Sequence, residues 1–220
     1  NTDTEYGSVD GGVTATLDDV DYLLQASNAY FPQHQLSRDD VIATWAGLRP
    51  LLAPETDDIS NTNITREHSI EVGVDGVVTV AGGKLTTYRK MAAEVVRVSL
   101  KALKQRGHRV KVTRSKTSKL PLPGASGLPV GGLQGVKDAL NNRVGGVLPP
   151  AICDHLVDTY GARAEAVADL AMANPEYAQP LIQGRPEIAA QVVFAVQEEF
   201  AATATDFLIQ RTQLFYRDQD

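Results

Sequence analysis

Two glycines, a lysine and two threonines separate an apolar run from a helical pattern in the stretch VVTVAGGKLTTYRKMAAEVV, residues 77–96. The β-branched residues of 77–80 predict a buried strand. From Leu85 onward, apolar residues recur at spacings of three and four, which predicts a helix that ends near Gly107. The Gly82-Gly83-Lys84 segment is therefore expected to form the turn between the strand and the helix.

This turn has groups that could bind a ligand. The first turn of a helix leaves backbone N–H groups unpaired and carries the positive end of the helix dipole. Glycines let a ligand approach the backbone, Lys84 adds a full charge, and the hydroxyls of Thr86 and Thr87 can cap the helix or donate hydrogen bonds. The pattern predicts a site for an anion or an electron-rich oxygen, and the alternative is a tight turn with a surface lysine.

Two arginines also stand at the ends of expected elements. Arg49 follows WAGL and precedes Pro50, and Arg66 lies in NITREHSIEV at a loop-to-strand edge. Together with Lys84 they make three cations at element ends, an arrangement that suits a small anionic substrate such as a phosphate or carboxylate. A surface ion pair is the alternative for each of them.

His68 is the histidine nearest to these cations in the sequence. It could accept a proton from an alcohol if it shares a strand face with Arg66. His34 and His108 lie in expected loops, and His155 neighbours Leu156 on a helical pattern, so these three are expected to be structural or solvent-facing. Cys153 lies on the same helical pattern and is expected to be buried.

Composition restricts the class of protein. The chain has 220 residues, of which 43% are hydrophobic and 22% charged, as in soluble globular proteins. Its one cysteine excludes an internal disulfide and fits a reducing compartment. We expect no signal peptide and no membrane span, hence a cytoplasmic location with any membrane contact peripheral. Metal-ligand spacing is absent from residues 138–220 and a calcium loop is not found, so no metal is expected.

The net charge of −6 is unevenly distributed. Residues 101–137 contain no acidic side chain, but they contain eight basic ones between 101 and 119 and a ninth at Lys137. No aromatic residue lies among the eight, which argues against nucleic acid as a partner. A solvated helix end that continues into a linker is the simplest interpretation, and anionic lipid or a phosphorylated ligand is the alternative.

The order of patterns predicts a mixed amino-terminal half. A helix is expected from Thr16, a strand from Asp40 into a loop at Pro50, and a hairpin in SIEVGVDGVVTV with Asp75-Gly76 as a primed turn. The domain boundaries predicted are 1–112 for this α+β part, 113–135 for a Pro/Gly-rich linker, and 136–220 for a helical domain.

The carboxyl-terminal half reads as wholly helical. One helix is expected from Pro149-Pro150 to Gly161, a second in ARAEAVADLAMA before Pro175, and a third from Pro186 through Phe200. A last helix would carry the apolar residues Phe207, Leu208 and Leu214. From the residues alone, this half is a packing or interaction module.

The motifs NTDTEYG, TWAGLRPL, ITREHSIEV, VAGGKLTTYRKMA and EEFAATATDFLIQRTQL together resemble the carboxyl-terminal part of the FAD-dependent, respiratory glycerol-3-phosphate dehydrogenases. The resemblance implies a piece of an FAD-linked α/β oxidoreductase fold followed by an all-α helical bundle. It departs from the family in the closing helix, where Gln210 stands before Arg211 in place of a second arginine.

The resemblance also implies roles for the residues above. Gly82, Gly83, Leu85 and Thr86 match a segment that faces the pyrimidine edge of the flavin, where N–H groups stabilise the negative charge at N1 and O2. Arg49, Arg66 and Lys84 match cations that bind the substrate, and Arg49 and Lys84 are the implied catalytic residues. The implied reaction is hydride transfer from C2 of glycerol 3-phosphate to FAD, giving dihydroxyacetone phosphate, with electrons passed to a quinone.

The G-x-G-x-x-G turn that binds the ADP part of FAD does not occur in these residues. We therefore expect a carboxyl-terminal fragment that is inactive alone. The same split would expose apolar surface along residues 77–80, which a homodimer could cover. Two alternatives stay open: an oxidase that passes electrons to oxygen, and a non-catalytic helical interaction module.

Overall fold

The computed structural model describes residues 12–48 and 67–217. The chain forms two compact units. Among the described residues, the first unit contains 14–45 and 121–217, and the second contains 12–13, 46–48 and 67–120.

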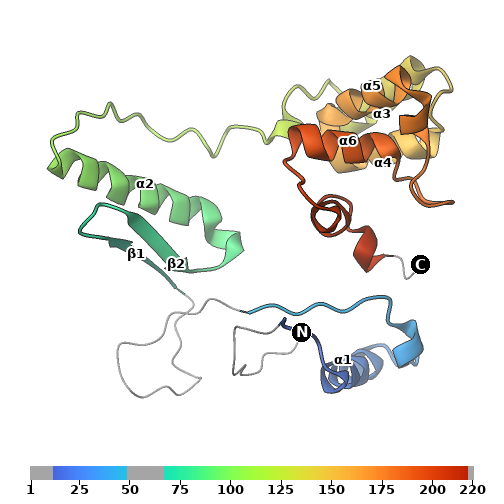
Figure 1. The fold of residues 1–220 in the computed structure, drawn as a ribbon, viewed down its shortest axis with the longest axis horizontal. Coiled ribbons are helices and arrows are strands. Elements are labelled where there is room, and N and C mark those ends of the chain that lie inside the picture. The colour runs from blue at the N-terminus through green and yellow to red at the C-terminus, as the bar shows by residue number, and fades with distance from the viewer. Residues whose placement is uncertain (1–11, 49–66, 218–220) are drawn as a thin grey trace. The chain divides into compact units, whose positions relative to one another are not determined.

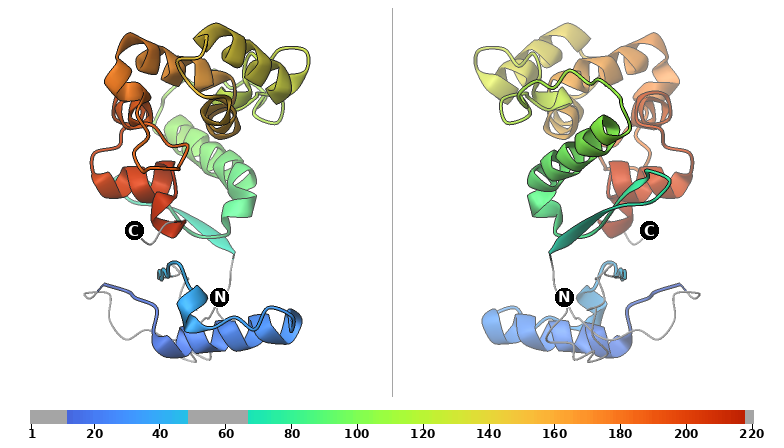
Figure 2. Two further views of the ribbon diagram at one scale, coloured as in Figure 1. Left: turned by 90° about the vertical axis from the view of Figure 1, so that its right-hand side faces the viewer. Right: turned by 90° about the vertical axis from the view of Figure 1, so that its left-hand side faces the viewer.

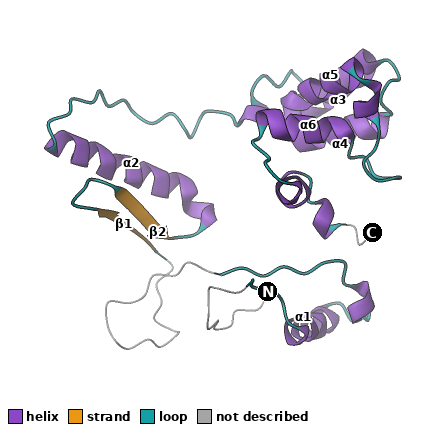
Figure 3. Ribbon diagram, in the orientation of Figure 1, coloured by secondary structure: helices purple, strands orange, loops and turns teal. Residues whose placement is uncertain are grey.

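The second unit is a β-hairpin covered by one long helix (Figures 1 and 2). Strand β1 (His68–Val72) pairs antiparallel with β2 (Val78–Gly82), and the register places His68 opposite Gly82. Helix α2 (Tyr88–Gln105) follows a short 3-10 turn (Leu85–Thr87). These elements confirm the predicted hairpin and the predicted helix, and Figure 3 shows the strands of the described chain within this hairpin.

The turn of the hairpin differs from the prediction. The N–H of Gly76 donates to the carbonyl of Gly73 at 2.9 Å, so Val74 and Asp75 are the central residues and the turn lies one residue earlier than Asp75-Gly76. Of these residues only Gly76 has a positive φ, 91°. A turn followed by a left-handed glycine is the usual solution for a hairpin loop of this length, and it needs one glycine where a primed turn needs positive φ twice.

The prediction that residues 77–80 are buried is wrong. Val77 is 59% exposed and Val80 is 44% exposed, because the hairpin has two strands and a helix on one side. Leu85 and Tyr88, expected on the apolar stripe of the helix, are also exposed. The half-buried face of α2 lies further along, at Met91, Val95, Val98 and Ser99.

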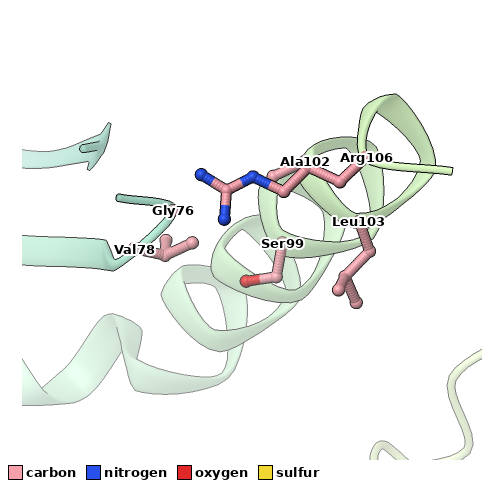
Figure 4. A pocket seen from close by; sticks show the side chains of 6 residues that line it. All are labelled: Gly76, Val78, Ser99, Ala102, Leu103 and Arg106. Carbon is pink, nitrogen blue, oxygen red and sulfur yellow. The ribbon is translucent and has the colours of Figure 1, made fainter. Parts of the chain in front are cut away.

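A cavity of about 260 Å³ lies between the hairpin turn and the end of α2 (Figure 4). Arg106 extends across it and donates to the carbonyls of Asp75 at 2.8 Å and Val74 at 3.2 Å. One basic side chain of the 101–119 segment is therefore a structural tie between α2 and the hairpin. The remaining seven basic residues of that segment are exposed.

Residues 12–48 contain helix α1 (Leu17–Tyr30) and a 3-10 turn (Arg38–Asp40). Thr16 caps α1 in a capping box with Asp19, which confirms the predicted helix start. The strand predicted from Asp40 is wrong within the described residues, since 41–48 run without a hydrogen-bonded partner strand. A β-branched run becomes a strand only where a second strand pairs with it.

The chain from Pro121 forms the helical domain that the sequence predicts (Figure 1). Its helices are α3 (Gly132–Val144), α4 (Pro150–Tyr160), α5 (Ala164–Ala173) and α6 (Ala189–Glu198), joined by 3-10 turns at Pro123–Ala125, Gly161–Arg163 and Pro175–Ala178. The core is apolar, and its largest buried side chains include Leu140, Leu148, Leu156 and Phe194. Cys153 is fully buried among them, as predicted.

Two boundaries of the predicted helices are wrong. Helix α6 starts at Ala189, not at Pro186, because residues 187 and 188 are extended and pair with residues 181 and 180. It ends before Phe200, which has a φ of 56° and is 89% exposed. The predicted last helix is instead a wide π-type segment (Asp206–Arg211) and a 3-10 turn (Leu214–Tyr216), separated by Gln213 at a φ of 59°.

Candidate functional site

The candidate site is the turn that joins β2 to α2. Gly82 and Gly83 both have positive φ, 74° and 83°, and Lys84 returns to an extended backbone as the residue before the 3-10 turn. The carbonyl of Lys84 accepts two hydrogen bonds from Thr87, one from its N–H at 2.9 Å and one from its hydroxyl at 2.8 Å. The strand thus reverses direction within two glycines, as the sequence predicts.

The N–H groups of Leu85 and Thr86 open the helical segment and form no hydrogen bond within the described part of the chain. Both residues are exposed, as is Lys84. Free N–H groups at a helix start carry partial positive charge, which suits an electron-rich acceptor. The turn therefore presents two free donors and one ammonium group on the same short segment.

A side chain at position 83 would crowd Met91 and His68. A Cβ atom placed there would lie 2.7 Å from Cε and 2.8 Å from Sδ of Met91, and 3.1 Å from Cβ of His68. The sulfur of Met91 lies 3.4 Å from the hydroxyl oxygen of Thr87. The inner side of the turn is thus filled by β1 and α2, and its outer side is exposed.

His68 does not act as a free base in this structure. Its Nε2 lies 2.6 Å from Oε2 of Glu94 on α2, and both side chains are more than two-thirds buried. This contact ties the first residue of β1 to α2 beside the glycine turn. The role of proton acceptor, which the sequence left open, is less suited to a ring whose Nε2 is already in a short hydrogen bond.

Arg49 and Arg66, the other predicted substrate-binding residues, lie outside the described residues. Lys84 is the member of the three whose position the structure gives. Sequence reasoning missed Glu94 and Met91, which hold the turn from α2. The spacing of three between Met91 and Glu94 places them on one face of the helix. The contact between His68 and Glu94 depends on the register in which β1 pairs with β2, and the sequence alone does not give that register.

The described residues also bear on metal binding and on membrane insertion. No cluster of three or more His, Cys, Asp or Glu side chains there could hold a metal ion. None of the helices described is both long enough and apolar enough to span a bilayer.

Comparison with known proteins gives the class first. Residues 1–89 match the family described as FAD dependent oxidoreductase, and residues 115–220 match the C-terminal domain of alpha-glycerophosphate oxidase. The turn at 82–86 lies inside the first match and the helical domain inside the second.

The relatives that the chain matches include glycerol-3-phosphate dehydrogenases. The chain is 38% identical to a glycerol-3-phosphate dehydrogenase of Synechocystis sp., over 97% of this chain and 37% of that protein. It is 32% identical to an aerobic glycerol-3-phosphate dehydrogenase of Staphylococcus epidermidis, over 100% of this chain and 39% of that protein. The chain thus spans about two fifths of the length of these relatives.

A solved structure agrees with this grouping. The glycerol-3-phosphate dehydrogenase of Bacillus halodurans, determined as a complex with FAD, superposes with a TM-score of 0.75 at 28% identity, over 98% of this chain and 40% of that one. The chain therefore resembles the carboxyl-terminal portion of FAD-dependent glycerol-3-phosphate dehydrogenases. The predicted resemblance and the predicted fold class, an oxidoreductase fragment followed by a helical domain, are confirmed.

Proposed function

We propose that this chain is the part of an FAD-dependent enzyme that binds glycerol 3-phosphate and supports its oxidation to dihydroxyacetone phosphate. The observation that carries the proposal is the free N–H pair of Leu85 and Thr86 beside Lys84, on a turn that lies within the match to FAD dependent oxidoreductases. The names of the relatives support the substrate.

FAD fits this turn on the evidence of the residues present. Gly82 and Gly83 bring the backbone to the surface without a side chain, and Met91 and His68 fill the inner side. The N–H groups of Leu85 and Thr86 would donate to the electron-rich edge of the ring. When bound, FAD supplies the acceptor for the hydride from C2 of the substrate.

Lys84 would contribute charge. An ammonium group beside an anionic substrate, or beside the reduced ring of the flavin, stabilises the negative charge by a charge-assisted interaction worth about 1.5–3 kcal/mol. Arg49 and Arg66 are proposed as the other cations of the same substrate site, with Arg49 holding the phosphate or the developing alkoxide.

A chimera tests the proposal, since the chain spans about two fifths of its relatives. Residues 1–220 replace the matching segment of the Synechocystis sp. dehydrogenase, and FAD-dependent oxidation of glycerol 3-phosphate is measured. Lys84→Ala is expected to lower kcat/KM by about 10- to 100-fold, because a loss of 1.4 kcal/mol is tenfold. Lys90→Ala, an exposed lysine on α2, is the control. A Lys84→Ala chimera as active as the control would refute the role of this turn.

The chain alone is proposed to be inactive, because it lacks the G-x-G-x-x-G turn. Flavin-dependent turnover by the purified 220-residue chain would contradict this. A quinone is the proposed electron acceptor, in keeping with relatives named as aerobic dehydrogenases. The oxidase alternative is supported by the description of the C-terminal domain match, and hydrogen peroxide formation by the enzyme would favour it.

Two partners remain as proposals. A homodimer could cover the exposed valines Val77 and Val80 of the hairpin. A chain that stays monomeric at all concentrations in sedimentation experiments would argue against a homodimer. Peripheral contact with anionic lipid is proposed for the exposed basic residues after Lys101. If the chain floats equally well with anionic vesicles after these basic residues are replaced, that contact is excluded.

A further inference from the structure

A second cavity lies within the helical domain and plays no part in the function proposed above. Its volume is about 250 Å³, and every residue that lines it is polar or charged. Its walls come from α4, from the start of α6 and from the segment after Gln210. A polar cavity of this size in a domain whose core is apolar is much larger than one water molecule needs.

One wall of the cavity is rigid. Gln191 is fully buried, its Oε1 accepts the N–H of Ile188 at 2.9 Å, and its Nε2 donates to the hydroxyl of Tyr160 at 3.3 Å. The hydroxyl of Thr212, which is also buried, donates to the carbonyl of Phe207 at 3.0 Å. These two side chains are held in place by the fold, while the opposite side of the cavity, at Asp158, Gln213 and Arg217, is open to solvent.

The cationic groups of the cavity are Arg211 and Arg217. Arg211 contacts Glu199, with its Nε 3.6 Å from the carboxylate. Among the described residues, no ion pair is formed by the guanidinium of Arg217, which donates to Oε1 of Gln213 at 3.5 Å. The lining carboxylate, Asp158, is already paired with Lys137 at 2.8 Å. Within the part of the chain that the structure describes, Arg217 is therefore the lining cation that forms no ion pair.

Two buried polar atoms beside the cavity lack partners. Nε2 of His155 and Oε2 of Glu187 form no hydrogen bond, and Nε2 of His155 lies 3.9 Å from Oε1 of Glu187. The side chain of Glu187 is 3% exposed and that of His155 18%. A buried carboxylate without a compensating charge is costly, so the pair would gain from a proton on His155.

Burial lowers the pKa of His155 below its ordinary value, and the charge of Arg217 lowers it further, while Glu187 and Asp158 act in the opposite direction. The charged groups around the ring and the cavity are thus Asp158 on α4, Glu187 before α6, and Arg211 and Arg217 from the carboxyl-terminal segment. An anion beside Arg217 would offset the repulsion between the guanidinium of Arg217 and a protonated His155. It would then favour the imidazolium, which would pair with Glu187.

We propose that this cavity binds a small phosphate-class oxyanion at Arg217, and that His155 takes up one proton when the anion binds. The shared chemistry is a phosphate dianion, either inorganic or as a phosphomonoester. The site is separate from the Gly82–Thr86 turn, because all of its residues belong to the helical domain.

The test follows the ring signals of His155 by NMR in the purified 220-residue chain. Inorganic phosphate is titrated at constant ionic strength, with chloride as the balancing anion, at several pH values. We expect saturable shifts at His155 and at the side-chain amide of Gln191, and a higher pKa of His155 in phosphate than in chloride. Glycerol 3-phosphate is titrated in parallel, and tighter binding of one of the two ligands identifies the source.

Variants make the result specific. Arg217→Gln is expected to weaken binding at least tenfold, and His155→Gln to remove its pH dependence. Arg143→Gln, an exposed arginine paired with Glu165, is the matched control and should bind like the parent chain. Lys84→Ala should also leave this titration unchanged, which separates the two sites. The proposal is overturned if phosphate causes no saturable shift, or if binding survives Arg217→Gln; the pKa of His155 in the unmodified chain decides the case if a variant fails to fold.

Discussion

Replacing Gly83 by alanine should lower the free energy of opening of the hairpin and α2. Two control variants separate the cost of the left-handed backbone from the cost of the side-chain contacts. Gly83 has a φ of 83°, and an added Cβ would lie 2.7 Å from Cε of Met91 and 3.1 Å from Cβ of His68. The left-handed backbone costs alanine about 1–2 kcal/mol. The contact with Met91 is with a flexible end, so it adds about 1 kcal/mol or less, while His68 is fixed by strand pairing and adds more.

Gly107 is the matched control for the backbone. Its φ is 82°, nearly that of Gly83, and a Cβ there would have no atom within 4 Å. Gly107→Ala should therefore show the cost of the left-handed backbone alone, about 1–2 kcal/mol, and Gly83→Ala should cost about 1–2 kcal/mol more. Met91→Ala combined with Gly83→Ala should recover part of the difference, because the double variant removes the side chain that the new methyl group meets.

The assay is amide hydrogen exchange at β1, β2 and the first turns of α2, read as the free energy of opening of this unit. Whole-chain circular dichroism would be dominated by the helical domain. If Gly83→Ala lowers protection no more than Gly107→Ala does, the turn is not packed against Met91 and His68, and the reasoning from these contacts fails.

The remaining predictions concern other parts of the fold. Arg106→Lys keeps the charge but loses the two-pronged contact with the carbonyls of Val74 and Asp75, so exchange should rise at the hairpin turn by roughly tenfold, while Arg109→Lys should change little. Leu156→Ala, at a fully buried position, should lower the free energy of unfolding of the helical domain by about 2–5 kcal/mol, and Leu133→Ala, 43% exposed, by much less. Hydrogen bonds from the hydroxyl of Thr203 and from the N–H groups of Ala202 and Thr203 lower the pKa of Asp206. Because the folded-state pKa is the lower one, this stabilisation is present above the unfolded pKa of about 3.9 and is lost as pH falls through the folded value. Asp206→Ala should thus be less stable than the parent chain at neutral pH, with a gap that narrows below about pH 4, and a gap of constant size would contradict the assignment.

The sequence predicts elements well where local chemistry determines them. Thr16 with Asp19 marks the start of α1, the proline pair at 149–150 and Gly161 mark the two ends of α4, and the glycines at 82–83 mark the turn of the candidate site. Each signal acts through hydrogen bonds or φ values within a few residues. The free N–H groups of Leu85 and Thr86 follow from the same local rule.

Features that depend on distant partners could not be read from the sequence. The run after Asp40 looks like a strand, but pairing determines whether it becomes one. Helix α6 starts at Ala189 and not at the predicted Pro186, because residues 180 and 181 pair with residues 188 and 187. The contact between His68 and Glu94, and the cavity beside His155, likewise join residues that are far apart in sequence.

The most direct test of the central claim is the reduction potential of FAD bound to the chimera described above, with Lys84 or Lys84→Ala in the turn. If the turn faces the flavin, loss of the ammonium group destabilises the negative charge of the reduced ring. A loss of about 1.5–3 kcal/mol corresponds to a potential lower by roughly 30–65 mV for a two-electron couple, with Lys90→Ala unchanged. An unchanged potential in a Lys84→Ala chimera that still binds FAD would contradict the account.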